Sequence, residues 1–360
     1  MLLLMTAHSA SPSSAQTPKA NAIDAYRNQL NENVVSVLGA DLTGGYIKIV
    51  EDIAKAVNDG QKLRVLPIVG EGGSQNIRDI LYLKGVDAGI VMSNSFDVYK
   101  KEALFEDLPN RLLYIARLYE EEVHIIASKD INKIEDLANK KVAFHGGAIV
   151  SGKLLFDKLG VKPSEISQVN FFQGLEKIKT GELSAIVRAT ASPMEQFEAS
   201  FDPNFHKLIT VPFDTRLIDS FLPSKLTSKQ YPKILGEGES IDTPAIGVVL
   251  AAYAWKPGTD RYRRLELFIN AFFSNIDKII KNPKRHPKWD DVNLAATLPG
   301  WKRFPAAEAW LKRNRPATTA DPKSDLQRNF TSYLEKRGVR DAQQDELFLE
   351  FQKWRQSGGR

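Results

Sequence analysis

The feature that most constrains the fold of this chain is a repeated succession of short β-like segments, glycine-rich turns and amphipathic helices. Apolar segments of this kind recur at 33–40, 63–69 and 86–92, and again at 142–144, 169–172 and 185–187. Strands that alternate with helices in this way are typical of parallel sheets in α/β proteins. Because the pattern restarts near residue 134, the sequence predicts two similar α/β lobes.

The middle of the chain and its C-terminal third connect these lobes. Segments 112–118 and 123–127 predict two separate strands, and we expect the charged run Glu120–Glu122 between them to be solvated. The apolar segment 245–254 predicts a strand that crosses back to the first lobe, followed by a long helix over 261–280. The expected organisation is a leader (1–20), lobe 1 (21–128), lobe 2 (129–242), a return to lobe 1 (243–315), and a linker with a helical extension (316–360).

Composition narrows the function classes. The 360 residues are 42% hydrophobic and carry a net charge of +5, with acidic and basic residues interleaved. No basic stripe with interleaved aromatic residues is present, so we expect no nucleic-acid partner. The absence of cysteine excludes disulfides, thiol catalysis and cysteine-ligated metals. The five histidines are dispersed, and no nucleophile–histidine–acid set is evident. We therefore expect no metal, no cofactor and no catalytic residues, and a monomeric protein that is not an enzyme.

The N-terminus indicates export. The apolar residues 1–5 precede Ser13-Ser14-Ala15, which is similar to a small-residue cleavage site. The charged beginning and the full apolar length of a signal peptide are missing. We interpret this segment as a clipped signal peptide; a disordered Ser/Ala/Pro leader is the alternative.

Three glycine-rich turns follow strands and open helices, at Thr43-Gly44-Gly45, Gly72-Gly73-Ser74 and His145-Gly146-Gly147. Such turns leave backbone N–H groups free at the positive end of a helix, where carboxylates and phosphates bind. Parallel α/β sheets bind ligands at the carboxyl ends of their strands, where these turns fall. The sequence therefore predicts a cleft for an anionic or polar ligand. The segment Gly147–Lys153 matches a phosphate-binding loop, but Leu154 stands where that loop needs Ser or Thr.

Arg188 ends an otherwise apolar strand and so is expected to point into the same cleft. Its planar guanidinium suits a bidentate clamp on a carboxylate; a surface arginine at the end of an element is the alternative. Ser93 and Asn94 end another strand and can contact the ligand or cap the next helix. Tyr46 can supply a wall of the cleft, and His145 a further polar contact, although a buried structural histidine is the alternative.

Several of these motifs together resemble those of a known family. Thr43-Gly44-Gly45-Tyr46, Gly72 to Ile77 and Gly85 to Asn94 are similar, in this order, to segments of the TAXI family. The similarity continues through Leu118-Tyr119 and through Ile134 to Val142, and it covers roughly residues 33–285. TAXI proteins are the extracytoplasmic solute-binding subunits of tripartite (TRAP) transporters.

The resemblance implies a two-lobed clamshell of the type II periplasmic-binding-protein kind. It also implies a periplasmic location, a small anionic metabolite as ligand (glutamate, 2-oxoglutarate or similar) and the TRAP permease subunits as partner. Carried over by position, the residues that line its cleft are Thr43, Gly45, Tyr46, Ser93, Asn94, His145, Gly146 and Gly147. The glycine-rich turn at 72–74 adds Gly73 as a candidate ligand contact. The sequence departs from the family at the loop after residue 144, at Arg188 and in the segment after residue 315.

These departures leave other functions open. A signalling or scaffold protein can reuse the two lobes and dock through its C-terminal helices. A cytosolic enzyme can use the near match to a phosphate-binding loop as a phosphate site. The binding protein is the reading that the sequence favours.

Overall fold

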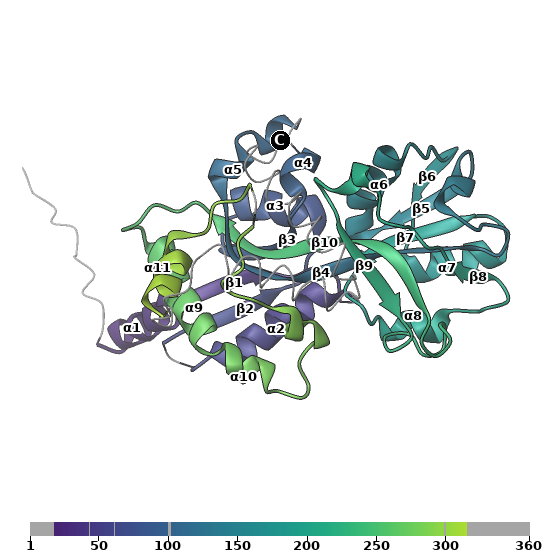
Figure 1. Cartoon of the computed structure of the whole chain (residues 1–360). Helices are drawn as coiled ribbons and strands as arrows, with labels where there is room; N and C mark the ends of the chain where they lie inside the picture. The colour runs from purple at the N-terminus through teal and green to yellow at the C-terminus, as the bar shows by residue number, and fades with distance from the viewer. Residues whose placement is uncertain (1–17, 43, 61, 100–101, 299, 315–360) are drawn as a thin grey trace, which may run out of the picture.

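The computed structural model describes residues 18–42, 44–60, 62–99, 102–298 and 300–314. Thr43, the first 17 residues of the expected leader and the expected extension 316–360 lie outside this part of the chain. Within it, the strands form one sheet in the order β2-β1-β3-β10-β4-β7-β5-β6, with β8 paired to β4 and β9 to β10 (Figure 1). The strands are β1 (Val34–Leu38), β2 (Arg64–Ile68), β3 (Ala88–Met92), β4 (Leu112–Ser128), β5 (Lys141–His145), β6 (Glu165–Gln168), β7 (Ala185–Thr190), β8 (His206–Leu208), β9 (Leu222–Thr227) and β10 (Ser240–Tyr253).

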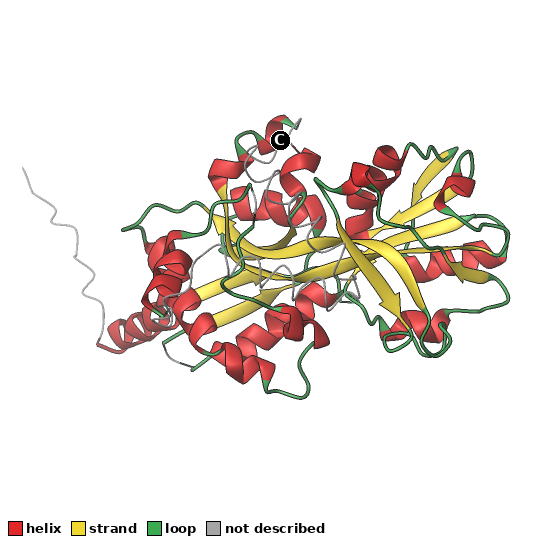
Figure 2. Ribbon diagram, in the orientation of Figure 1, coloured by secondary structure: helices red, strands yellow, loops and turns green. Residues whose placement is uncertain are grey.

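The sheet extends through two lobes, and two long strands join them. Lobe 1 contains the parallel strands β1, β2 and β3, and lobe 2 contains β5 to β9 (Figure 2). The antiparallel strands β4 and β10 run through both lobes. The prediction of separate strands at 112–118 and 123–127 is wrong, because the intervening glutamates continue β4 without a break. The chain thus passes between lobes inside β4 and again inside β10.

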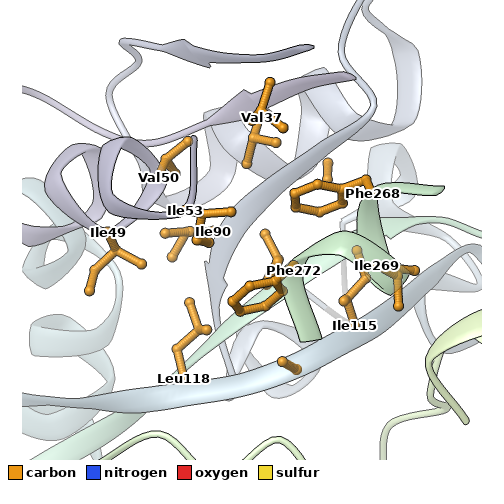
Figure 3. Close-up of a cluster of buried hydrophobic side chains, with 14 of the residues drawn as sticks. Val37, Ile49, Val50, Ile53, Ile90, Ile115, Leu118, Phe268, Ile269 and Phe272 are labelled. Carbon is orange, nitrogen blue, oxygen red and sulfur yellow. The ribbon is translucent and has the colours of Figure 1, made fainter. Parts of the chain in front are cut away.

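Helices cover both faces of the sheet in lobe 1. One face carries α2 (Gly45–Val57), α9 (Asp260–Ser274), α10 (Ile276–Ile280), η5 (Pro287–Asp291) and α11 (Pro305–Arg313), and the other carries α3 (Gly73–Tyr82), α4 (Ser95–Tyr99), η1 (Ala103–Phe105) and α5 (Leu108–Arg111). Figure 3 shows how apolar residues of α2 and α9, such as Ile53 and Phe272, meet Ile90 and Ile115 of the sheet. Fully burying one such side chain stabilises the fold by about 1.5–3 kcal/mol. Since both faces are covered, the central strand β3 is apolar and buried throughout instead of alternating.

Lobe 2 is built in the same way. Its two faces are covered by η2 (Ile134–Leu137), η3 (Gly146–Ile149), α6 (Ser151–Leu159) and η4 (Thr215–Leu217), and by α7 (Phe171–Lys179) and α8 (Glu195–Ser200). The prediction of a strand at 169–172 is wrong. The strand β6 ends at residue 168, and Asn170 caps α7 by accepting a hydrogen bond from the N–H of Phe172 at 3.0 Å. An asparagine that satisfies a free N–H in this way begins a helix.

The remaining helices differ from the expected ones in two places. The predicted helix over 261–280 is interrupted at Asn275, which separates α9 from α10. Pro18–Glu32 forms α1, a helix that the pattern did not predict; Arg263 holds its end by donating to the carbonyl of Glu32 at 2.9 Å. Among the described helices, none combines the length and the apolar character needed to cross a bilayer.

Candidate functional site

The point where the chain passes between lobes holds three consecutive buried glutamates. Glu120, Glu121 and Glu122 are 7%, 4% and 3% exposed, so the expectation of a solvated charge run is wrong. They are buried because β10 pairs along them, with Gly247, Ile246 and Ala245 opposite. Glu122 also faces Thr190 of β7. We call this region the lobe junction.

Glu122 forms a buried ion pair that connects three parts of the chain. The Nζ of Lys288, in η5 of lobe 1, donates to Glu122 Oε1 at 2.6 Å. The other oxygen, Oε2, accepts from the N–H of Ser192 at 3.1 Å and from its hydroxyl at 2.7 Å. Gln230 Nε2 in turn donates to Ser192 Oγ at 2.7 Å. A buried carboxylate needs this many partners because removing it from water is costly.

Glu121 has a different environment. Its Oε2 accepts a hydrogen bond from the Tyr46 hydroxyl at 3.0 Å, so α2 of lobe 1 contacts the crossing strand. Burial raises the pKa of Glu121 to about 8, although the Tyr46 hydrogen bond and the charge of Arg188 act in the opposite direction. At neutral pH this carboxyl group is therefore mostly protonated, and it can donate as well as accept a hydrogen bond.

Arg188 lies in β7 at the same junction and is 3% exposed. Its guanidinium stacks over the ring of Phe171 at 5.2 Å. Burial lowers the pKa of Arg188, while Asp41 of lobe 1, Glu121 and Tyr231 act to raise it. Arg188 is thus a buried cation of lobe 2 that lies near two acidic groups from outside this lobe. The alternative of a surface arginine is excluded.

The two histidines that flank Arg188 in the sheet are neutral. Register pairs Arg188 with His124 on β4 and with His145 on β5. Burial lowers the pKa of His124 to about 3, and it also lowers the pKa of His145. The Nδ1 of His145 is 3.0 Å from the carbonyl of Val169, so it donates there. His124 Nε2 meets the Tyr231 hydroxyl at 2.8 Å, which makes His124 a structural residue of this wall.

The N-terminus of α2 reaches the junction from lobe 1. A Cβ atom on Gly45 would lie 3.2 Å from the Cβ of Ala191, 3.3 Å from Tyr119 Oη and 3.4 Å from His286 Nε2. Ala191 follows β7, so the two lobes are in contact here. Gly44 supplies no side-chain cap, and the first N–H groups of the helix therefore lack the usual partner.

A second contact between the lobes involves the other predicted residues. Gly147 packs against Met92 at the end of β3, so closely that a Cβ atom would lie 1.8 Å from the methionine methyl group. Asn94 Nδ2 donates to Ser151 Oγ of α6 at 3.4 Å. Ser93 is held by backbone bonds, with its N–H on Gly247 and its carbonyl accepting from Trp301 Nε1 at 2.9 Å. Met92 and Asn94 thus connect the end of β3 to lobe 2, whereas Ser93 is bonded to β10 and to Trp301.

For the remaining predicted residues, the structure gives no side-chain contact at the lobe junction. Gly73 begins α3 with a φ of 53°, and Gly146 has a φ of 58°; no described atom lies within 4 Å of where a Cβ would stand on either. Thr43 lies outside the described residues. The segment that is similar to a phosphate-binding loop forms η3 and the start of α6, and Gly152 packs there against the ring of Phe144.

The structure thus brings Gly45, Tyr46, His145 and Arg188 to the junction. Sequence reasoning missed Tyr119, Glu121, Glu122, His286 and Lys288 as members of this site. One signal was available, because three glutamates interrupt an otherwise apolar β segment. The arrangement offers buried charges and hydrogen-bond donors of both lobes, which is the chemistry of ligand binding at a domain interface. In the described part of the chain, no group of three or more His, Cys, Asp or Glu is placed to hold a metal ion.

Comparison with known sequences decides the family. Residues 38–284 match the NMT1-like family. The chain belongs to the NMT1-like family. The match covers most of both lobes and ends just before His286. This match does not identify the TAXI subtype, so membership of the TAXI family remains a prediction from the sequence motifs. No protein with a curated description matches the chain.

Several solved structures are similar to this NMT1-like protein at low identity. The periplasmic binding protein BugD is 14% identical over 78% of this chain and 93% of its own, with a TM-score of 0.46. A TctC solute binding protein from Polaromonas is 15% identical over 72% and 86%, with a TM-score of 0.42. The periplasmic VFT2 domain of BvgS from Bordetella pertussis is 12% identical over 71% and 94%, with a TM-score of 0.40.

Proposed function

We propose that this protein is a periplasmic solute-binding protein that binds a small carboxylate at the lobe junction and delivers it to a membrane permease. The observation that carries the proposal is the position of Arg188, a buried cation of lobe 2 near Asp41 of lobe 1 and Glu121 of the crossing strand. A ligand that reaches this point contacts both lobes at once. Its binding therefore favours the arrangement in which the lobes meet.

Arg188 favours a carboxylate for two reasons. Its planar fork of donors matches the two oxygens of a carboxylate, and its burial makes each charge-assisted bond stronger than it is in water. Asp41 supplies the negative charge that Arg188 needs when the ligand is absent, and Glu121 lies nearby as a mostly protonated carboxyl group. A carboxylate ligand can compete with them without leaving the guanidinium isolated. The TRAP permease as recipient rests on the motif resemblance alone.

The proposal is tested by thermal unfolding of the purified full chain with a panel of small carboxylates and their neutral amides. A ligand that binds only the folded protein at 100 times its Kd stabilises it by about 2.7 kcal/mol. We expect the melting temperature to rise with at least one carboxylate and not with the matched amide. If no carboxylate changes the melting temperature, or if an amide acts equally, the carboxylate assignment fails.

The location of the protein needs a separate measurement. Fractionation of the native cells, followed by immunodetection, should place the protein in the periplasmic fraction. Recovery in the cytoplasmic fraction would contradict export and would leave the binding assignment intact.

A further inference from the structure

Two hydrogen-bond donors at the junction have no role in the network described above. Tyr119, on β4, is 1% exposed, and its hydroxyl has no hydrogen-bond partner within the described structure. Burial raises the pKa of Tyr119 well above its usual value, and the neighbouring carboxyl groups of Glu121 and Glu122 act in the same direction, so the hydroxyl keeps its proton. An unsatisfied buried hydroxyl destabilises the fold, and such a group persists where something else uses it.

His286 places a second donor beside this hydroxyl. The N–H of Lys288 donates to His286 Nδ1 at 3.1 Å, which leaves the proton of the neutral ring on Nε2. The ring is neutral at physiological pH, because burial lowers the pKa of His286 to about 4. The His286 ring stacks on the Tyr119 ring at 6.1 Å. Two neutral donors therefore lie side by side.

Both donors lie next to the N-terminus of α2. The Tyr119 Oη and the His286 Nε2 are 3.3 Å and 3.4 Å from the position where Gly45 would carry a Cβ. This helix has 13 residues, and Gly44 provides no side-chain cap for its first N–H groups. The end of the helix adds a partial positive charge at the same place. The Tyr119 hydroxyl, the His286 Nε2 and the first N–H groups of α2 are all hydrogen-bond donors. The described residues supply no acceptor for the Tyr119 hydroxyl.

We infer that Tyr119 and His286 determine ligand specificity by binding an uncharged acceptor oxygen of the ligand, at a subsite distinct from Arg188. This inference rests on the proposed function and narrows its ligand to a carboxylate with a second oxygen, such as an oxo or hydroxyl group. The family match ends at residue 284 and so does not cover His286.

The experiment compares pairs of probes that differ by one oxygen. Isothermal titration of the full chain is carried out with 2-oxoglutarate and glutarate, and with malate and succinate. We expect wild type to bind the oxygen-bearing member of at least one pair roughly fivefold or more tightly, as one neutral hydrogen bond gives. Tyr119→Phe removes one donor and keeps the ring. His286→Asn removes the Nε2 donor and keeps an acceptor in place for the N–H of Lys288.

Each variant removes one of the two donors and should reduce the preference within the pair several-fold, while the unsubstituted probe binds as before. Tyr114→Phe is the control, since Tyr114 lies on the same strand but under Arg303, away from the junction. If both variants keep the preference, or if wild type binds both members equally, the subsite is wrong while the proposed function stands. If wild type binds none of the four probes but other carboxylates raise its melting temperature, the subsite is again wrong. If no carboxylate binds at all, the proposed function fails and this inference fails with it.

Discussion

Lys288 Nζ and Glu122 Oε1 lie 2.6 Å apart in a place where both side chains are buried. The two residues are far apart in the sequence: Glu122 belongs to the strand that crosses between lobes, and Lys288 to a short helix near the end of lobe 1. The pair therefore fastens the late part of lobe 1 onto the junction. Through Glu122 Oε2 it also reaches Ser192 of lobe 2.

Removing the lysine should destabilise the fold strongly. Lys288→Met leaves Glu122 as a buried charge without its cation, which costs about 3–5 kcal/mol of unfolding free energy. Lys179→Met is the matched control, because Lys179 forms an exposed pair with Glu176 whose contribution is about 0–1 kcal/mol. Denaturation in urea measures both. Equal stability of the two variants would show that the buried pair does not hold the junction together.

The combination of Lys288→Met with Glu122→Gln gives a further check on the same pair. Neutralising the carboxylate removes the isolated charge, so the double variant should recover part of the stability that Lys288→Met loses. A double variant that is as unstable as the sum of the two single variants would mean that the residues do not interact.

The raised pKa of Glu121 predicts that the free energy of unfolding depends on pH in a specific way. Its pKa is about 8 in the folded protein, above the usual value near 4.5, so the folded state binds more protons than the unfolded state between these limits. Stability due to this group is therefore greatest at low pH and falls as the pH rises from about 5 to 8, by up to about 1.4 kcal/mol per pH unit. Glu121→Gln should lack this fall.

The comparison with Glu121→Gln is necessary because other groups act in the opposite direction. His124 and His286 have lowered pKa values, about 3 and about 4, so their contribution to stability is lost as the pH falls toward these values. The difference in unfolding free energy between wild type and Glu121→Gln isolates the carboxyl group. A difference that stays constant from pH 5 to pH 8 would contradict the assignment.

Gly45 should be needed for the lobes to meet. Gly45→Ala places a methyl group 3.2 Å from the Cβ of Ala191 and so holds lobe 1 away from lobe 2. We expect ligand affinity to fall several-fold, whereas the unfolding free energy changes by less than about 1 kcal/mol. Gly44→Ala is the control, as its methyl group makes only an ordinary contact with the Asp41 carbonyl at 3.5 Å. Equal ligand affinity in the two variants would remove Gly45 from the site.

Most of the fold could be predicted from local patterns. Apolar segments, glycine turns and amphipathic helices depend on neighbouring residues, so β1, α2, β3 and α6 fall where the periodicity indicates. The misses have physical causes. Asn170 begins a helix by capping it, where the apolar residues around it favoured a strand. Asn275 interrupts a helix whose apolar face continues beyond it.

The site was less predictable than the fold. Glu121 and Glu122 resemble part of a solvated run because their burial is compensated by Tyr46, Ser192 and Lys288, which come from distant parts of the sequence. A local sequence pattern cannot indicate partners that lie so far away in the chain. Glu120 pairs with Arg117, only three residues away. Arg188 was found because an arginine in an apolar strand is unusual by itself. The expectation that it ends the strand is wrong, because β7 continues past it to Thr190. His286 was one of five dispersed histidines until the fold placed its Nε2 beside Tyr119.

The central claim is that Arg188 binds the carboxylate of a ligand held between the lobes. Its most direct test is the affinity, by isothermal titration, of Arg188→Met for whichever carboxylate raises the melting temperature of wild type. Arg216→Met serves as the control, because Arg216 is an exposed residue that pairs with Asp214. Arg188→Lys keeps the charge without the fork, and circular dichroism verifies that each variant is folded. We predict that Arg188→Met loses roughly 30-fold or more in affinity, that Arg188→Lys loses less and that Arg216→Met is unchanged. A folded Arg188→Met protein that binds the carboxylate as tightly as wild type would contradict the claim.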